Sequence, residues 1–391
     1  AEANLTKRLQ LLFDRLGIDA VRQAVEPGRD NIFAVVGGAN VASASQPLVF
    51  FEAHQDTVPV TGMTIPPFVP EVRQGRLYGR GACDTKGGMA AMLFALARLH
   101  AERRSDMPTV VVACTVNEEF GFSGALAART LWRRGKNEKE TRQEPLSPSL
   151  PLPFSTSPFL RSVLLRRPDY AVVAEPTELQ VVVAHKGLVR WRCRARGRAA
   201  HSAMPQAGEN AIYKMGKALV AIERYARDVV GGLGSHPLCG PATLNVGTIG
   251  GGVSVNTVPD DCTIEIDRRM VPHETHDAAR QHLIDYLERE AGLGFVLEHE
   301  APFMKALPLA DDHNRALADR LLAAASQIGE PCRTVGVPYG TDGATFADAG
   351  VPTVVFGPGS IAQAHTADEW VALDQVEKAA EIYYRFVKSF C

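Results

Sequence analysis

The sequence predicts an α/β protein in which a sheet covered by helices is interrupted by a smaller domain. Its 391 residues exceed one ordinary hydrophobic core and favour two domains of unequal size. Short Val-rich runs alternate with helical patterns over most of the chain, as in sheets with helices on their faces. Between about residues 188 and 300 the strands instead alternate apolar and polar residues, which is typical of a half-exposed sheet.

The larger domain is predicted to begin with an amphipathic helix over residues 1–17, and we expect no signal peptide there. The apolar face of this helix consists of Leu9, Leu12, Phe13 and Leu16. Strands are expected from five short apolar runs: 47–53, 108–116, 170–175, 180–185 and 351–357. The helix predicted after Asp84 carries a core stripe at helical spacing: Met89, Met92, Leu93, Leu96 and Leu99.

The smaller domain is expected over residues 188–300, so that the larger domain consists of 1–187 and 301–391. One-sided strands are predicted at 188–198, 243–252, 262–271 and 294–300, with amphipathic helices at 209–230 and 275–290. One-sided strands with two helices describe a small α+β domain inserted into the larger one. The proline-rich segment 135–160 is interpreted as a surface excursion without a fold of its own.

The bulk composition excludes several classes of partner. The net charge of −2 argues against a nucleic-acid surface and against a basic membrane-binding face. No apolar run approaches the ~20 residues that span a bilayer. The seven cysteines are scattered without Cys-x-x-Cys spacing, which favours reduced thiols and a cytoplasmic protein. The glycine run 247–252 lacks the Lys-Ser/Thr of a phosphate loop.

Potential metal ligands follow the apolar runs of the larger domain. In chain order they are His54 and Asp56, Asp84, Glu118 and Glu119, Glu175, and His365. In open α/β sheets the functional crevice lies beyond the carboxyl ends of the strands, so these side chains are expected to meet. Each has a structural alternative when taken singly, such as a helix cap for Asp84. Together they would bury several uncompensated carboxylates in one place, which is costly.

A pair of divalent cations removes that cost. Imidazole and carboxylate donors without thiolate suit Zn²⁺, with Co²⁺ or Mn²⁺ as alternatives. A site with two metals ~3.5–4 Å apart needs one carboxylate to bridge them. The adjacent pair Glu118 and Glu119 is expected at the end of the 108–116 strand, where neighbouring side chains point to opposite sides and can serve two roles. A solvated strand end is the alternative for this pair.

Six stretches between residues 50 and 375 resemble the metallohydrolase family of acetylornithine deacetylase, succinyl-diaminopimelate desuccinylase, aminoacylase and carboxypeptidase G. They are "AHQDTVPV", "LYGRGACDTKGGMAA", "NEEFGFSGA", "AEPTELQVVVAHKG", "AHSAMP" and "GPGSIAQAHTADEW". The resemblance implies a catalytic α/β domain with a mixed sheet, interrupted by a ferredoxin-like lid that is often the dimer interface. It covers nearly the whole chain, although the proline-rich segment 135–160 is not a regular family feature.

The resemblance also implies roles for individual residues. Asp84 bridges two metal ions, His54 and Glu175 complete one, and Glu119 and His365 complete the other. Asp56 orients His54. Glu118 is the general base that takes a proton from the metal-bridging water and returns it to the departing amine. A cis peptide bond is expected between Asp84 and Thr85.

Further residues are expected at the substrate. The family pattern places His201 and Asn256 there, with His201 as an oxyanion donor that often acts across a two-fold dimer. We therefore expect a homodimer through the lid strands and a lid that closes. Arg268 is predicted to bind a substrate α-carboxylate together with the backbone around Gly340 and Thr341, because arginine suits bidentate carboxylate binding. The alternative is that Arg268 or Arg269 is a solvated strand residue.

The favoured function is removal of an N-acyl group from an amino acid, most like the acetylornithine deacetylase of amino-acid biosynthesis. Succinyl-diaminopimelate desuccinylase comes second, and exopeptidase or dipeptidase activity third. A catalytically inactive binding protein of the same fold is the alternative from another class, and a lost ligand or a replaced Glu118 would favour it. The stretch "GFSGA" is not Gly-x-Ser-x-Gly, which argues against a serine hydrolase.

Overall fold

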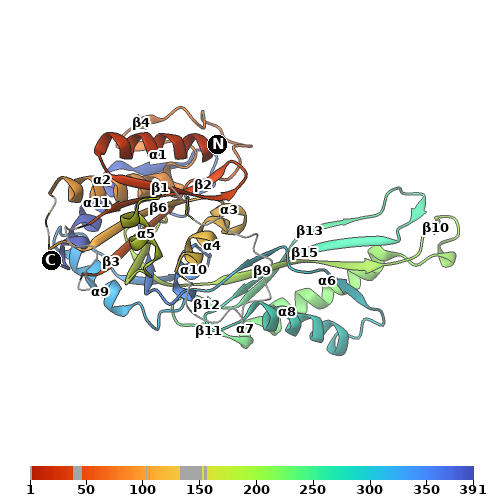
Figure 1. Ribbon diagram of the computed structural model, residues 1–391. Helices are drawn as coiled ribbons and strands as arrows, with labels where there is room; N and C mark the ends of the chain where they lie inside the picture. The colour runs from red at the N-terminus through yellow and green to blue at the C-terminus, as the bar shows by residue number, and fades with distance from the viewer. Residues whose placement is uncertain (1, 38–45, 103, 105, 133–151, 154–155) are drawn as a thin grey trace. The chain divides into compact units, whose positions relative to one another are not determined.

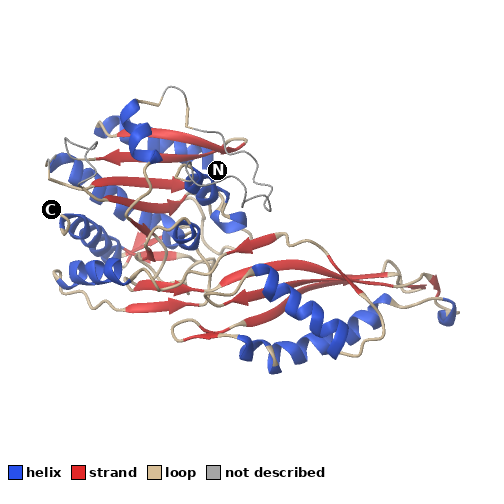
Figure 2. Ribbon diagram, turned by 60° about the horizontal axis from the view of Figure 1, so that its bottom comes forward, coloured by secondary structure: helices blue, strands red, loops and turns tan. Residues whose placement is uncertain are grey.

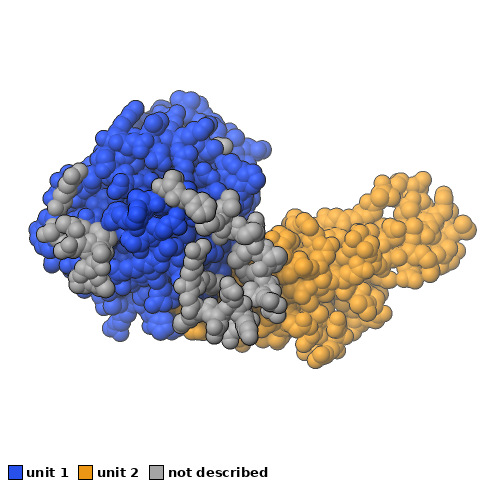
Figure 3. Space-filling view, in the orientation of Figure 1, with its two compact units in different colours: residues 1–183, 311–335, 341–391 blue, residues 184–310, 336–340 orange. Residues whose placement is uncertain are grey.

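The computed structural model describes residues 2–37, 46–102, 104, 106–132, 152–153 and 156–391. Most of the proline-rich segment 135–160 therefore lies outside the described residues. The chain divides into two compact units, 1–183 with 311–335 and 341–391, and 184–310 with 336–340 (Figure 3). We expected the smaller domain to end at residue 300, whereas 301–310 also fall in the second unit because β17 (Met304–Ala306) pairs with β9 (Gly187–Arg196).

The first unit is built on a mixed sheet of eight strands in the order β1-β2-β6-β3-β7-β19-β8-β18. Their bounds are β1 Asp19–Glu26, β2 Arg29–Val36, β3 Leu48–His54, β6 Thr109–Thr115, β7 Tyr170–Val173, β8 Val181–His185, β18 Thr334–Val337 and β19 Thr353–Val355. All five predicted strands are present as β3, β6, β7, β8 and β19. The hairpin β1–β2 was not predicted. Neighbours among β6, β3, β7 and β19 run parallel, so their carboxyl ends share one edge.

Helices cover both faces of this sheet (Figures 1 and 2). They are α1 Glu2–Leu16, α2 Gly87–Glu102, α3 Glu118–Gly121, α4 Ser123–Thr130, α5 Pro158–Leu165, α9 Arg315–Ser326, α10 Gly343–Asp348 and α11 Leu373–Lys388. A turn (η1, Ala82–Lys86) precedes α2, and a small sheet is formed by β4 Glu71–Arg73, β5 Arg76–Tyr78 and β20 Trp370–Ala372. No helix among the described residues is long and apolar enough to cross a bilayer.

Neighbouring side chains of β3 point alternately to the two faces of the sheet and so pack in different cores. Phe51 packs toward α11, with its ring centre 5.2 Å from that of Tyr383, within the core shared by α1, α2, α9 and α11. Phe50 points to the opposite face, 5.2 Å from Trp132 and 5.2 Å from Phe346 of α10. This packing confirms the α/β architecture with helices on both faces of a mixed sheet.

The apolar face predicted for α2 is buried in the structure, whereas that predicted for α1 is only partly buried. In α2 the stripe Met89, Met92, Leu96 and Leu99 is buried, and Leu93 packs partly buried against the same core. In α1 the buried face consists of Glu2, Thr6, Leu9 and Phe13. Leu12 and Leu16, which we placed on this face, are each 38% exposed. The buried stripe of α1 is therefore narrower than predicted and includes two polar residues.

The second unit contains a sheet in the order β13-β15-β9-β16, with β17 also paired to β9. Its further strands and helices are β10 Ala200–His201, β11 Ser235–His236, β12 Gly240–Pro241, β13 Thr243–Gly251, β14 Thr257–Val258, β15 Asp261–Met270, β16 Leu297–His299, α6 Ala211–Asp228, α7 Val230–Leu233 and α8 His276–Asp285, with short turns η2 Pro205–Ala207 and η3 Tyr286–Glu290. Helices α6 and α8 line one face of the sheet and share its apolar core (Figure 1). The strand–helix–strand–strand–helix–strand sequence β9-α6-β13-β15-α8-β16 is a ferredoxin-like connection, as the family resemblance implied.

The close approach of α4 to the end of β6 requires glycine at position 124. A Cβ on Gly124 would lie 2.3 Å from the carbonyl oxygen of Val116 and 2.8 Å from Oδ1 of Asn31. Asn31 itself donates to the Gly124 carbonyl and accepts from the Val116 amide. This contact joins α4 to the segment that leads into Glu118.

We expect Gly124→Ala to lower the melting temperature, because the added methyl group must push backbone away from backbone; overpacking of this kind costs about 1–3 kcal/mol. Gly216→Ala is the matched control. Gly216 is exposed within α6, where an added Cβ meets nothing within 4 Å, so alanine should stabilise the helix by about 0.5–1 kcal/mol. Thermal melts of both variants check the contact, and a Gly124→Ala protein as stable as the wild type contradicts it.

Candidate metal centre

Apart from Asp84, the predicted ligands lie at or beyond the carboxyl ends of the parallel strands. His54 is the last residue of β3, and Glu175 lies two residues beyond β7. Asp84 lies in the turn η1, and His365 lies in the loop between β19 and β20. Glu119 follows β6, which ends at Thr115. The parallel arrangement of β6, β3, β7 and β19 explains why residues so distant in sequence reach one edge of the sheet.

We expected Glu118 and Glu119 to continue the strand, but they do not. Asn117 adopts a left-handed conformation with φ 63°, and Glu118 then begins the four-residue helix α3. The left-handed residue breaks the extended backbone, so the two carboxylates diverge from a helical turn and not from alternating strand positions. The sequence correctly placed both side chains at this strand end but gave them the wrong backbone.

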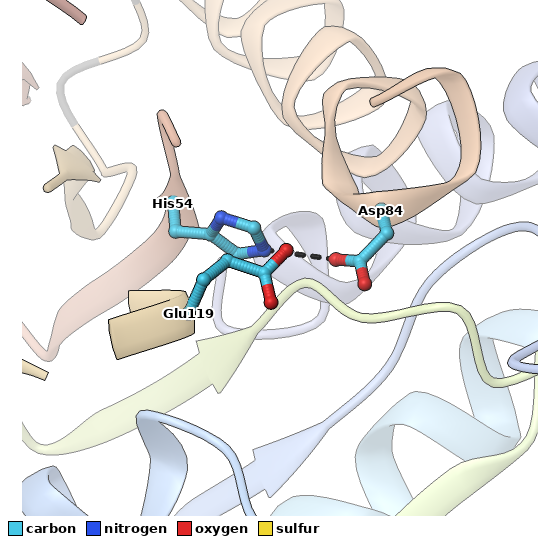
Figure 4. A group of neighbouring side chains, drawn as sticks. All are labelled: His54, Asp84 and Glu119. Atoms are coloured by element: carbon cyan, nitrogen blue, oxygen red, sulfur yellow. Dashed lines mark hydrogen bonds and ion pairs between the residues drawn. The ribbon is translucent and has the colours of Figure 1, made fainter. Parts of the chain in front are cut away.

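The Asp84 carboxylate lies between two histidines. Its Oδ1 is 2.9 Å from Nε2 of His54 and its Oδ2 is 3.1 Å from Nε2 of His365. His365 Nε2 is also 3.2 Å from Oε2 of Glu119. One donor atom each from His54, Asp84 and Glu119 lies within 4.8 Å of the others, and Figure 4 shows the three side chains pointing toward one another. A carboxylate with one oxygen toward each histidine has the geometry that a bridging ligand needs.

Asp56 supports this cluster from behind. One of its oxygens lies 3.3 Å from Nδ1 of His54. The same carboxylate accepts hydrogen bonds from the backbone amides of Glu118 and Glu119, each at 3.1 Å. Although burial acts to raise it, His54 and these two amides lower the pKa of Asp56. Asp56 therefore stays ionised and links the orientation of His54 to that of the α3 turn.

The donor set fits divalent cations. Glu118 and Glu175 are buried side chains, 9% and 6% exposed. Burial and the negative charge of neighbouring carboxylates, Asp84 among them, raise the pKa of both. A cluster of carboxylates and imidazoles without thiolate is the ligand chemistry of Zn²⁺, Co²⁺ or Mn²⁺. Two such ions would supply the positive charge that buried carboxylates require.

Glu369, which was not among the predicted residues, holds the turn that carries Asp84. Its fully buried carboxylate accepts from Arg80 Nη1 at 2.8 Å. It also accepts from three backbone amides of the turn, Gly81 at 2.9 Å, Cys83 at 2.9 Å and Asp84 at 3.0 Å. The Asp84–Thr85 peptide bond is cis, which confirms that expectation. The only sequence signal for Glu369 was its position four residues after His365.

Two further buried carboxyl groups were also missed. Glu52, two residues before His54 on β3, is hydrogen-bonded by the hydroxyl of Thr115. Burial raises the pKa of Glu52 to about 7. Asp342, at the start of α10, is fully buried, and its burial together with the charge of Glu52 raises its pKa as well. Two more buried carboxyl groups therefore lie beside the predicted ligands, one on β3 and one at the start of α10.

Four of the five predicted substrate residues, Arg268 among them, belong to the second unit. His201 on β10 is exposed and accepts from the amide of Ala203 at 3.1 Å. Asn256 precedes β14, the strand paired with β10, and its carbonyl accepts from the amide of Ser202 at 3.0 Å. The structure therefore brings His201 and Asn256 together within this unit. Of the remaining pair, Gly340 belongs to the second unit and Thr341 to the first.

Arg268 does not have the surroundings that we expected. Its side chain is 0% exposed, and its Nη2 lies 2.7 Å from Oε1 of Glu274 in an ion pair. This weighs against the predicted carboxylate contact and against the alternative of a solvated strand residue, because a buried guanidinium already paired must lose its partner to bind another anion. Arg269 occupies the other face of β15, where it bonds to Asp267 and is 27% exposed.

The sequence also matches known proteins. Residues 50–389 match the model of peptidase family M20/M25/M40. The whole chain aligns at 30% identity with 89% of an acetylornithine deacetylase from Myxococcus xanthus. Over 97% of the chain, it is 26% identical to N-formyl-4-amino-5-aminomethyl-2-methylpyrimidine deformylase from Bacillus subtilis, of which 87% is covered.

Solved structures show the same fold. A tripeptidase from Staphylococcus aureus matches with a TM-score of 0.74 and 22% identity, over 99% of this chain and 92% of that one. A dinuclear metal binding peptidase of the M20 family from Bacillus subtilis matches with a TM-score of 0.66 and 16% identity, over 99% and 91%. The family match extends over most of the sequence, and the identity to the deacetylase extends over all of it. The chain belongs to peptidase family M20/M25/M40, whose members are hydrolases of amide bonds.

Proposed function

We propose that this protein is a dinuclear metal-dependent amidohydrolase that removes the acyl group from an N-acylated amino acid, with N-acetylornithine as the leading substrate. The observation that carries the proposal is the Asp84 carboxylate, which offers one oxygen to His54 and the other to His365. The 30% identity to an acetylornithine deacetylase over the whole chain supports the choice of substrate. The deformylase relative supports the broader class, since it also removes an acyl group.

In this proposal Asp84 is shared by two ions. His54 and Glu175 complete the first set of ligands, and Glu119 and His365 complete the second. The contacts of Asp84 and Glu119 with the histidines support this division. Zn²⁺ is our first choice of metal, with Co²⁺ or Mn²⁺ as alternatives.

The ions would supply Lewis-acid activation of the scissile carbonyl and lower the pKa of the attacking water. Glu118 is assigned the movement of protons. Its carboxylate takes a proton from the water as the acyl carbon is attacked and gives it to the nitrogen of the departing amine. Asp56 accepts a hydrogen bond from the backbone amide of Glu118 and so keeps this residue in place. The Asp56 carboxylate also orients His54.

The second unit is proposed to supply the remaining contacts to the substrate. His201 would donate to the oxyanion, with Asn256 beside it. The backbone at Gly340, together with that of Thr341 from the first unit, would contact the substrate carboxylate. We further propose a homodimer through the strands of this unit, in which His201 acts on the partner's substrate after the lid closes. The exposed position of His201, next to the segment that contains Asn256, is the observation that supports this role.

A substrate screen tests the proposed function. The purified protein, analysed for metal by mass spectrometry, is offered N-acetylornithine, N-succinyl-diaminopimelate, N-formyl amines and dipeptides. We expect two metals per chain, loss of activity on chelation, and the highest kcat/KM for the N-acetyl amino acid. A preference for dipeptides would move the protein to the peptidases of the family, and full activity without metal would contradict the mechanism.

The two adjacent glutamates should separate metal binding from turnover. Glu118→Gln is expected to keep both metals and lose about 10²–10⁴ in kcat, because the amide cannot accept the proton. Glu119→Ala is expected to lose one metal, because it removes a ligand. Metal content and kcat of the two variants check this division. A Glu118→Gln protein that binds one metal fewer would show that the roles are wrongly assigned.

Mixed dimers test whether His201 acts across the interface. His201→Ala and Glu118→Gln are each expected to be inactive alone. When the two proteins are mixed and allowed to exchange subunits, a hybrid contains one site with both residues intact, so part of the activity should return. Native mass spectrometry confirms that hybrids have formed. Hybrids that form and stay inactive would place His201 within its own chain's site or outside catalysis.

A further inference from the structure

A polar network from the N-terminal segment ends on Asn117, the residue directly before Glu118. The Asn117 side chain accepts from Arg29 Nη1 at 3.0 Å. It donates to Glu26 Oε1 at 3.2 Å and contacts the hydroxyl of Ser123 at 3.0 Å. Its backbone amide donates to Oε1 of Glu2 at 3.1 Å. Both polar atoms of the side chain and the amide of this one residue are therefore bonded.

Arg29 is the centre of this network. Its Nε and Nη2 form a two-point contact with the Glu2 carboxylate, with Nη2 at 2.9 Å from Oε1. Its Nη1 bonds to Glu26 at 3.2 Å in addition to Asn117. Glu2 is buried at 8% exposure, so this ion pair is shielded from solvent on the carboxylate side. The guanidinium, with its five N–H donors in a planar fork, suits a bidentate carboxylate together with two further acceptors.

The network holds the backbone of Asn117 in an uncommon conformation. Asn117 has φ 63°, a value that non-glycine residues rarely adopt, although asparagine tolerates it better than most. This single residue turns the chain from β6 into α3 and so sets the direction of Glu118 and Glu119. On the other side of the turn, Asp56 accepts the amides of both glutamates. The turn is thus held by two independent sets of hydrogen bonds.

We propose that Arg29, anchored by Glu2, is a positioning residue for the reaction: through Asn117 it fixes the turn that aims Glu119 at its metal ion and Glu118 at the attacking water. This proposal rests on the proposed function for the roles of those two glutamates. Neither Glu2 nor Arg29 lies within the segment that matches the family model, which begins at residue 50. The N-terminal helix and the hairpin β1–β2 thereby contribute to the metal centre without touching it.

The experiment is a metal titration of Arg29→Met, with Co²⁺ alone as the probe. Glu119 is assigned to only one of the two ions, so we expect one of the two binding steps to weaken by about 10- to 100-fold while the other is unchanged. On N-acetylornithine, kcat should fall and KM should change little. Arg8→Met, the same substitution at an exposed position of α1, should leave both binding steps and kcat as in the wild type. Two unchanged steps in Arg29→Met would overturn the proposal, and equal weakening of both would show a general structural role instead.

A second pair of variants covers the case in which Arg29→Met folds poorly. Asn117→Gly removes the side-chain bonds but permits the left-handed backbone, whereas Asn117→Ala removes the bonds and disfavours that backbone. We expect both to weaken the same binding step, alanine more than glycine. Equal wild-type affinity in both variants would overturn the proposal.

Hydrogen exchange separates this proposal from the proposed function. The amides of Glu118 and Glu119 should exchange faster in Arg29→Met than in the wild type or Arg8→Met, without added metal or substrate. If the wild-type protein binds no Co²⁺ but these amides still lose protection, the proposed function fails and the structural link stands. If both metals bind and protection is unchanged, the link itself is wrong.

Discussion

The placement of Asp84 is the constraint on which the site depends, and it is set by one buried carboxylate. The Glu369 carboxylate accepts hydrogen bonds from three backbone amides of one turn and from the Arg80 guanidinium. Its own charge is thereby compensated while it fixes the backbone around Asp84. A buried carboxylate without such donors would cost several kcal/mol. Glu369 follows His365 by four residues in the same loop. One side chain therefore couples the position of Asp84 to the loop that carries His365, whose Nε2 lies 3.1 Å from Oδ2 of Asp84.

The same physical demand explains why the site concentrates negative charge. Asp84 and Glu119 contact histidines at one edge of the sheet, and Glu118 and Glu175 interact electrostatically with His54. Asp84, Glu118 and Glu175 are buried, so water solvates these three carboxyl groups poorly. Such a cluster opposes folding unless cations or protons neutralise it. Metal binding at this cluster would be linked to the stability of the first unit, because the ligands must be deprotonated and close together before an ion can be held. Asp56 differs from them, since His54 and two amide donors lower its pKa and keep it ionised.

Residues at strand ends could be predicted from the sequence to lie together, because the carboxyl ends of parallel strands share one edge of the sheet regardless of loop conformation. That geometry places His54, Glu119 and His365 near one another without any knowledge of side-chain contacts, and Asp84 reaches them from the turn before α2. Glu369 and Arg29 could not be found this way. Arg29 and Asn117 are 88 residues apart, and Glu369 and Asp84 are 285 apart. Hydrogen bonds over such separations leave no periodic signal. The helical turn at Glu118 was missed for a related reason, since a single left-handed asparagine has no pattern.

Arg268 shows a different failure, because its signal was present in the sequence. On β15 the residues Ile264, Ile266 and Met270 are buried, and Arg268 has the same parity. Strand alternation therefore places its guanidinium in the apolar core of the second unit, where only a partner such as Glu274 makes burial tolerable. The opposite parity belongs to Asp267 and Arg269, which bond to each other on the other face. Of the two adjacent arginines, only Arg269 has a guanidinium that an acidic ligand could reach without breaking a buried ion pair.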